Sequence, residues 1–459
     1  MTAGDDLETC QFGNGIRLVH TRANLMRDWS LRAQLIVILA LGFVIRLAIA
    51  PFPGGFGYDV DTFRNWAETL HSYPLDEFYS RADAPDHLPG DLWVMHALGW
   101  AFRLFGGENV DGAMFAWCLK LVPAISDVAV AVAIYALVAL FSSQADGVRM
   151  AGWYILNPVT IFVTAFWGQW DSVSLAILLV GFYLIVKSDP YWILASPFVV
   201  WAVLIKPQLA VPAIALIALI LFRFLDRGDF SRERLAGFAA RGAASLVLGL
   251  LTAVAILLPF SVGLPGMDTK WNLVDRLREA LDLYPHTTLG AANVWMIPIG
   301  SLERIADDSP VVLGLTPNQW GSIGLAVSLI YIVVTVVRAF GRTHRDKAMC
   351  WAAAAAVYAI FMVPTRVHER YLFPFIAFSL LYLVLDGHRR LPTRVFWAVS
   401  VVFTLNLLLV FGGFRTTLPG SIRWITEGFG FVSLSLLNVA LFALFLALPW
   451  LHARQGEEA

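Results

Sequence analysis

The feature of this sequence that most constrains its fold is a series of long apolar runs along almost the whole chain. A helix that crosses the ~30 Å hydrocarbon core of a bilayer needs about 20 apolar residues, and about twelve segments approach that length. These segments are residues 31–50, 118–141, 150–167, 171–187, 190–205, 207–225, 240–260, 318–340, 348–364, 371–386, 393–411 and 428–450. The runs predict an all-α polytopic membrane protein with about twelve transmembrane helices, within a range of about 11–13.

The composition agrees with a membrane protein. Only 15% of the 459 residues are charged, whereas a soluble globular protein carries about 25%. The net charge of −1 argues against nucleic acid as a partner. Cys10, Cys118 and Cys350 lie in separate segments without metal-site or CxxC spacing, so we expect no disulfide framework. Arg46 interrupts the first apolar run, which favours a retained membrane helix over a cleaved signal peptide.

The stretch 91–106 is a further candidate span, and it decides which loops share a side of the membrane. If it does not cross, the five-arginine loop 223–242 and the C-terminal tail lie on the same side as the basic segment 17–32. Cytoplasmic loops carry an excess of Lys and Arg. We therefore predict that both termini are cytoplasmic, that the protein lies in the plasma membrane, and that 91–106 lies at the outer interface or re-enters.

This topology predicts two large outer loops within a single integral membrane domain over residues 1–459. The first loop, 51–117, belongs to a catalytic module over 31–260. The second loop, 261–317, precedes C-terminal helices over 318–450. We find no internal repeat and no soluble domain.

Four polar motifs fall at the predicted outer ends of the spans. Asp59, Asp61 and Arg64 lie in the first loop, and the others are WGQWD (167–171), KPQ (206–208) and RVHER (366–370). Each has an ordinary structural explanation. Either aspartate can cap a helix whose apolar stripe is Phe63, Trp66, Ala67 and Leu70. The tryptophans of WGQWD are typical of interfacial belts, and a lone Lys206 would snorkel to the interface.

The motifs together indicate more than each one does alone. Charges at membrane depth are costly and tend to be functional. Arg366, His368, Arg370 and Lys206 suit a phosphate, which at this depth suggests a lipid phosphate. A carboxylate facing them suggests a base that deprotonates an attacking hydroxyl.

The same motifs carry a resemblance to a known family. The chain resembles the GT-C class of glycosyltransferases that use polyprenyl-phosphate sugars, and most of all the branch with the endoplasmic-reticulum glucosyltransferases of lipid-linked oligosaccharide and their bacterial relatives. The matching positions in the first loop are Asp59, Asp61, Arg64 and Trp66, and Ser126-Asp127 matches loosely. Later matches are Gln169, Asp171 and Ser172; Lys206, Pro207 and Gln208; and Val367, His368 and Glu369, followed by Arg370 to Pro374. The Tyr-Pro-Pro element common in relatives is replaced by DHLPGDLW (86–93).

The resemblance implies an inverting transfer of a sugar, such as the hexoses mannose or glucose, from a polyprenyl-phosphate donor. It implies a lipid-linked or glycan acceptor and an active site on the extracytoplasmic face among membrane lipids. Asp59 would be the catalytic base, with Asp61 supporting it. Arg64, Trp167, Gln169, Asp171, Gln208 and Glu369 would contact the sugar or organise the loop. We expect no metal and no other cofactor, because one carboxylate pair supplies few of the oxygen ligands that Mg²⁺ or Mn²⁺ needs.

Two alternatives stay open on the sequence. A multi-pass transporter or flippase for an anionic or lipid-linked substrate also combines about twelve spans with charged groups. However, the expected repeats are missing, and the charges gather at one face instead of the midplane. A protein O-glycosyltransferase of the same fold would differ only in its acceptor. The lack of a sizeable outer domain favours a small acceptor.

Overall fold

The computed structural model describes residues 22–52, 57–107, 112–187, 191–228, 230–340, 344–414 and 428–457. This part of the chain is built almost entirely from helices. The first half contains α1 (Arg22–Ile49), α2 (Gly57–Ser72), α3 (Phe78–Arg81), α4 (Pro89–Leu104), α5 (Ala113–Phe141), α6 (Gln144–Ile155), α7 (Pro158–Ile161), α8 (Asp171–Lys187), α9 (Ala195–Ile205), α10 (Ala210–Asp226) and α11 (Arg232–Leu257). The second half contains α12 (Leu273–Asp282), α13 (Met296–Ile299), α14 (Pro317–Arg338), α15 (Arg345–Met362), α16 (Phe373–Leu385), α17 (Arg390–Phe414) and α19 (Phe429–Glu457).

Several short elements join these helices. They are η1 (Leu75–Glu77), η2 (Phe162–Trp167), η3 (Tyr191–Leu194), η4 (Pro207–Leu209) and η5 (Leu258–Phe260). Two short strands, β1 (Val262–Gly263) and β2 (Trp271–Asn272), pair in parallel after α11. Cys118 and Cys350 are both free, and Cys10 lies outside the described residues.

Every predicted span contains a helix, but the helices differ in how well they suit a bilayer. In the described residues, seven are long and apolar enough to cross a membrane, or eight if α6 and the bent segment Pro158–Trp167 form one span. The helix α16 is shorter, and almost all of its side chains are buried inside the protein. The architecture is therefore an all-α polytopic membrane protein, and the full count of twelve crossings stays a prediction.

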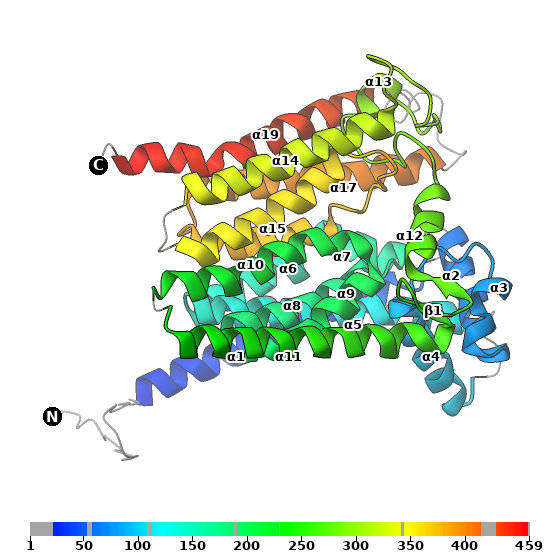
Figure 1. Ribbon diagram of the computed structural model, residues 1–459, viewed down its shortest axis with the longest axis horizontal. Coiled ribbons are helices and arrows are strands. Elements are labelled where there is room, and N and C mark those ends of the chain that lie inside the picture. Colours follow the sequence, from blue (N-terminus) through cyan, green and yellow to red (C-terminus); the bar gives the residue numbers. More distant parts are fainter. Residues whose placement is uncertain are drawn as a thin grey trace.

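The long helices run side by side in one bundle (Figure 1). Helices of the N-terminal half form one side of the bundle, and α14, α15, α17 and α19 form the other. The two halves meet where α10 packs against α15 and where α5 packs against α16. The start of α1 and the end of α19 lie at one end of the bundle, while α2, α3, α4 and α12 gather at the opposite end.

The two predicted outer loops pack against each other at that second end. Lys270 forms an ion pair with Asp76, which joins the strand region of the later loop to the earlier one. The Arg276 guanidinium lies 4.2 Å from the centroid of the Tyr79 ring and donates a hydrogen bond to the Pro85 carbonyl oxygen. The loops therefore form one cap on the bundle instead of two separate lobes.

The stretch 91–106 lies within this cap as most of α4. Leu92 and Met95 are fully buried in the same apolar cluster as the first loop. Trp93 Nε1 donates to the Ile256 carbonyl oxygen at 3.0 Å. The Gly90 backbone approaches α9 so closely that an added Cβ would lie 2.5 Å from the Leu204 carbonyl. These contacts fix α4 against α9 and α11, and its position relative to a membrane stays a prediction.

The predicted apolar stripe is buried along one face of α2. Phe63, Trp66, Ala67 and Leu70 each expose 4% of their surface or less. They pack in the cluster that also contains Phe78, Leu92 and Trp170. A stripe of this period packs one side of a helix against its neighbours. The neighbour here is protein, so α2 is anchored in the cap and holds its first turn in a fixed place.

A buried ion pair joins α1 to α5 within the bundle. Arg46 Nε lies 2.8 Å from Asp127 Oδ2, and both side chains are fully buried. Arg46 also donates hydrogen bonds to the carbonyl oxygens of Gly42 and Ile155 and to the Thr160 hydroxyl. Asp127 also accepts hydrogen bonds from the hydroxyls of Tyr154 and Thr164. Buried charges persist where they are paired and hydrogen-bonded. This network connects α1 and α5 to α6, α7 and η2.

Candidate functional site

Asp59 lies in the first turn of α2, directly after the chain leaves α1. Its Oδ2 accepts hydrogen bonds from Trp167 Nε1 at 2.8 Å and from Gln169 Nε2 at 2.7 Å. Its Oδ1 accepts no hydrogen bond from any residue that the structure describes. The two donors fix the orientation of the carboxylate and leave one oxygen able to accept a proton. This is the arrangement that a general base needs.

An irregular backbone segment brings Trp167 and Gln169 to Asp59. The element η2 is a π-helix, and Gly168 ends it at φ +90°, a left-handed conformation that favours glycine. The backbone N–H groups of Gly168 and Gln169 both donate to the Val163 carbonyl oxygen, at 3.2 and 3.0 Å. The next residues then begin α8 with Asp171 in its first turn. The turn thus aims two side chains at Asp59 and one at the loop before α16.

The loop before α16 supplies a partly buried arginine and a buried carboxyl group. Arg370 Nη1 donates to Glu369 Oε1 at 3.1 Å, and Arg370 Nε lies 3.9 Å from Asp171 Oδ2. The guanidinium lies 5.8 Å from the centroid of the Trp167 ring. Burial raises the pKa of the Glu369 carboxyl to about 7, the positive charge of Arg370 opposes this rise, and the negative charge of Asp59 adds to it. Glu369 therefore titrates near neutral pH beside Arg370.

His368 lies in the same loop and is held from both sides. Its ring centroid is 5.5 Å from that of Tyr284 and 5.4 Å from that of Tyr371. Burial, followed by the positive charges of Arg370 and Lys206, holds the pKa of His368 well below its usual range. His368 is therefore neutral at physiological pH, and one of its ring nitrogens carries a proton that it can donate.

Lys206 is a buried cation at the end of α9, where the backbone turns into η4. The residue exposes only 6% of its surface. Its side chain makes no hydrogen bond or ion pair with any residue in the described ranges. An unpaired charge costs several kcal/mol to bury. Lys206 is thus placed to bind an anion that enters the site from outside the chain.

The remaining predicted residues lie in other surroundings. Asp61 forms an ion pair with Arg64 instead of facing Asp59. These two residues line a cavity of about 370 Å³ together with Lys120. Gln208 is half-buried in η4. In the described residues no three His, Cys, Asp or Glu side chains gather in a way that could hold a metal ion.

Arg366 is engaged by two carboxylates of the second outer loop. Its Nε lies 2.8 Å from Asp307 Oδ2, and its Nη1 lies 2.7 Å from Asp282 Oδ1. Both aspartates compete with any phosphate for this guanidinium. The geometry therefore favours a role for Arg366 in fixing the loop before α16 to the cap, and it leaves Arg370, His368 and Lys206 as the predicted phosphate ligands.

Two residues near the site were not among the sequence predictions. Lys120 is buried in α5, and its Nζ donates to the Phe166 carbonyl oxygen at 3.0 Å, within the π-helix. The signal was a lysine inside the apolar run 118–141. Tyr284, which follows α12 within the second loop, contacts His368. No pattern in the sequence singles it out, because it follows α12 in a segment with no recognisable motif.

Comparisons with known proteins reach only distant similarities. No known family model matches the sequence, and no curated protein matches it. Among solved structures, ArnT from Cupriavidus metallidurans bound to undecaprenyl phosphate is 14% identical with a TM-score of 0.46, over 92% of this chain and 77% of that chain. The apo oligosaccharyltransferase of Archaeoglobus fulgidus is 14% identical with a TM-score of 0.45, over 90% of this chain but only 56% of its own length. Similarities at this level assign neither an activity nor a substrate to this chain.

Proposed function

We propose that this protein is an inverting glycosyltransferase of the GT-C class that moves a sugar from a polyprenyl phosphate to an acceptor hydroxyl. The observation that carries the proposal is the oriented Asp59 carboxylate, with one oxygen bound by Trp167 and Gln169 and the other without a hydrogen bond from the described residues. The buried Lys206 and the partly buried Arg370 both act electrostatically on His368, and such a pair of cations suits a phosphate. The ordered motif resemblance supports the same class.

The proposed reaction uses Asp59 as the general base. Asp59 Oδ1 accepts the proton of the acceptor hydroxyl, and the hydroxyl oxygen forms a bond to the anomeric carbon of the sugar. The bond between that carbon and the phosphate oxygen breaks on the opposite face, and its electron pair leaves with the polyprenyl phosphate. Attack opposite to departure inverts the configuration. A base of this kind contributes about 10²–10⁴-fold to a rate.

The leaving phosphate gains charge as the bond breaks, and fixed cations lower the energy of that charge. Lys206 and Arg370 are the cations of this proposal, and neutral His368 donates a hydrogen bond. Such preorganised groups act strongly where water is excluded. A hexose such as mannose or glucose, a lipid-linked or glycan acceptor, and a site on the extracytoplasmic face of the plasma membrane complete the proposal. It needs no metal.

Substitution of Asp59 by Asn tests the proposed base. The amide keeps the shape of the side chain but cannot accept the proton, so we expect sugar transfer to fall about 100- to 10,000-fold. The assay uses purified protein in detergent with a synthetic polyprenyl-phosphate sugar and a panel of acceptors. The matched control is Asp61→Asn, because Asp61 is exposed and ion-paired with Arg64. We expect that control to lose less than about 10-fold.

Two results would contradict the proposal. Asp59→Asn could retain transfer within about 10-fold of the unchanged protein, which would return Asp59 to a helix-capping role. Alternatively, the unchanged protein could transfer no sugar in detergent from any donor yet move a lipid-linked sugar across a sealed vesicle. That outcome would favour the transporter. Transfer to a peptide hydroxyl, with none to lipid-linked glycans, would identify a protein O-glycosyltransferase of the same mechanism.

A further inference from the structure

Lys120 is a buried lysine of α5 to which the proposed reaction assigns no role. It lies inside the apolar run 118–141 and exposes 5% of its surface. Its Nζ donates to two backbone carbonyl oxygens, that of Phe166 at 3.0 Å and that of Phe52 at 3.4 Å. Burying an ammonium group is costly, so its presence here needs an explanation. The two carbonyl groups belong to the two chain segments that meet at the proposed base.

The bond to Phe166 caps the π-helix from which Trp167 reaches the base. Phe166 is the last residue but one of η2, and no backbone N–H of the described residues donates to its carbonyl oxygen. The last carbonyl groups of a helix lack partners within the helix. A lysine side chain is a favourable donor to them, because its charge also interacts well with the helix dipole. Lys120 therefore supplies the donor that the end of η2 leaves out.

The aliphatic stem of Lys120 packs against the turn that follows η2. A Cβ added at Gly168 would lie 3.0 Å from Lys120 Cγ and 3.4 Å from Lys120 Cε, so the stem lies along the Gly168 backbone. Gly168 has φ +90° and stands between Trp167 and Gln169. Those two side chains donate the hydrogen bonds to Asp59 Oδ2. Lys120 thus contacts the chain on both sides of Trp167, through its Nζ on one side and its stem on the other.

The longer bond to Phe52 acts on the segment that carries Asp59. Phe52 is the last described residue before α2, which begins at Gly57 and holds Asp59 in its first turn. A cavity of about 370 Å³ lies between this turn and α5, and Gly57, Val60 and Lys120 are among the residues that line it. Because the cavity leaves α2 and α5 incompletely packed here, the hydrogen bonds of Lys120 contribute more to the placement of the turn.

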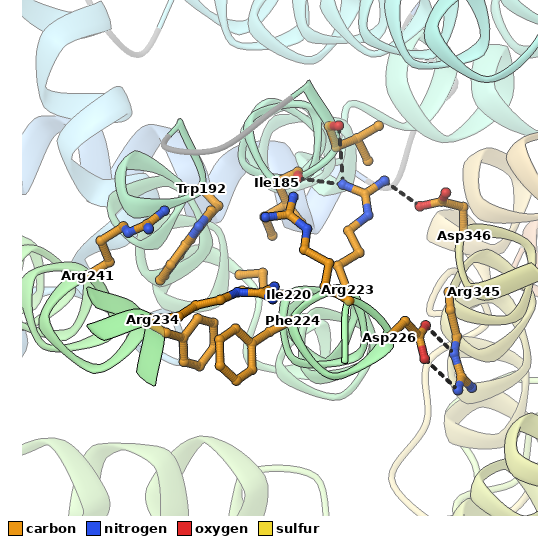
Figure 2. Close-up of a pocket in the computed structure, with 13 residues that line it drawn as sticks. Ile185, Trp192, Ile220, Arg223, Phe224, Asp226, Arg234, Arg241, Arg345 and Asp346 are labelled. Atoms are coloured by element: carbon orange, nitrogen blue, oxygen red, sulfur yellow. Dashed lines mark hydrogen bonds and ion pairs between the residues drawn. The ribbon is translucent and has the colours of Figure 1, made fainter. Parts of the chain in front are cut away.

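Arg223 caps the end of another helix, where no residue of the candidate active site follows. Its Nη1 donates to the carbonyl oxygens of Ile185 and Val186 at 3.0 and 3.2 Å, in the last turn of α8 (Figure 2). Its Nη2 lies 2.6 Å from Asp346 Oδ1, which pairs its charge. Both cations therefore cap a helix end, but only Lys120 caps one whose next residues hold the proposed base.

We propose that Lys120 is a positioning residue for the catalytic base. It holds the turn at Gly168 close to the segment that leads into α2. In that position Trp167 and Gln169 reach Asp59 Oδ2, and Oδ1 stays open to the acceptor hydroxyl. Lys120 touches neither the substrates nor the reacting atoms. The inference rests on the proposed function, because it assigns Lys120 a role that acts through Asp59.

Lys120→Met keeps the stem against Gly168 and removes both hydrogen bonds. We expect the kcat of sugar transfer to fall about 10- to 100-fold, because a displacement of about 1 Å near the reacting groups has a cost of this order. The KM values of donor and acceptor should change less than about 3-fold. Arg223→Met is the matched control, since it removes a helix-capping cation elsewhere. It should lower the thermal unfolding midpoint and change the kcat of folded protein less than about 3-fold.

The same substitution in the Asp59→Asn variant shows whether Lys120 acts through the base. Where the base is already removed, its position no longer matters. Lys120→Met should therefore lower the remaining rate of Asp59→Asn less than about 3-fold, whereas general damage to the fold would lower it by the same factor as in the unchanged protein.

Hydrogen exchange measured by mass spectrometry gives a second readout that needs no activity. The backbone N–H groups of Gly168 and Gln169 donate to the Val163 carbonyl oxygen. Their exchange should become at least about 10-fold faster in Lys120→Met, because the loss of a charge-assisted cap lets the turn open more often. In Arg223→Met it should stay within about 2-fold of the unchanged protein.

Other outcomes would overturn the proposal. An unchanged kcat in Lys120→Met would leave Lys120 with a structural role only, and a higher donor KM at unchanged kcat would make it a donor ligand. Unchanged exchange at Gly168 and Gln169 would show that the turn does not depend on it. If Lys120→Met fails to fold, Lys120→Gln, whose amide nitrogen ends one bond short of Nζ, is judged by the same outcomes. An unchanged protein that transfers no sugar, or an Asp59→Asn variant that keeps its rate, would instead contradict the proposed function itself.

Discussion

The protein contains two groups of buried charges that differ in how completely their partners are supplied by the chain. In the Arg46–Asp127 network, the guanidinium has four hydrogen-bond acceptors, and the carboxylate has three donors counting Arg46 itself. In the candidate active site, Asp59 is bound through one oxygen only, and Lys206 has no side-chain partner among the described residues.

Whether the fold supplies all partners of a buried charge distinguishes structural from functional polar clusters in a membrane protein. A buried charge that the fold satisfies by itself has no need of a ligand, and its removal damages the fold. A buried charge that the fold leaves unsatisfied lowers stability, and a ligand of opposite charge can offset that cost. Substitutions in the Arg46–Asp127 network should therefore lower stability and leave activity unchanged. Substitutions of the unsatisfied charges in the candidate active site should lower activity and leave stability unchanged or higher.

The largest expected effect on stability comes from Arg46→Met. The substitution leaves the Asp127 carboxylate without its cation inside the bundle, and breaking a buried pair in this way costs about 3–5 kcal/mol. We expect a large fall in the thermal unfolding midpoint in detergent, measured by differential scanning fluorimetry. The protein that remains folded should keep its rate of sugar transfer, because Arg46 does not contact Asp59, Trp167 or Gln169 in the structure.

The double variant Arg46→Met with Asp127→Leu provides the control. Replacement of both charges removes the unpaired group, so the double variant should be more stable than Arg46→Met alone. If Arg46→Met alone left the thermal unfolding midpoint unchanged, the network would contribute nothing to the stability of the fold. Loss of transfer in protein that is still folded would instead assign the network to the active site.

Lys206→Met is expected to have a smaller effect on stability than Arg46→Met and to lower activity instead. The substitution keeps the length of the side chain and removes an unpaired charge, so the unfolding midpoint should stay the same or rise. Transfer should fall about 100-fold or more, because a preorganised cation contributes on the order of 3 kcal/mol to the transition state. Initial rates at several concentrations of a polyprenyl-phosphate sugar measure this loss.

Lys270→Met is the matched control for Lys206. Lys270 lies in the cap, is largely exposed and is paired with Asp76, so its removal should change transfer less than about 3-fold. If Lys206→Met lowered the midpoint and left transfer unchanged, Lys206 would belong with Arg46 among the structural charges. The absence of a partner would then not distinguish a functional buried charge from a structural one.

Much of the fold followed from the sequence because apolar runs of membrane length admit few alternatives. The predicted span 171–187 coincides with α8, and the stripe of Phe63, Trp66, Ala67 and Leu70 is the buried face of α2. The break between α6 and the bent segment that ends at Trp167 could not be predicted from hydropathy. A π-helix and a left-handed glycine depend on hydrogen bonds and contacts with residues distant in the sequence.

The site was predictable in part, since carboxylates and cations stand out against an apolar background. Asp59 comes from one motif and Trp167 and Gln169 from another, and the two motifs meet in hydrogen bonds. Arg366 and Arg370 look alike in RVHER, and only the structure distinguishes them. Arg366 faces Asp282 and Asp307, which lie 84 and 59 residues away in the chain, and no local pattern specifies those pairings.

The smallest expected effect concerns pH and the carboxyl group of Glu369, whose pKa is about 7. Above that pH the ionised carboxylate shares Arg370 and competes with the donor phosphate, whereas below it the neutral acid does not. The donor is a phosphodiester whose own charge stays constant, so its KM should rise several-fold, and at most about 10-fold, between pH 6 and pH 8. Glu369→Gln should abolish this rise and hold the KM near its low-pH value. A donor KM that falls with pH, or a rise that persists in Glu369→Gln, would show that Arg370 is a satisfied structural charge like Arg46.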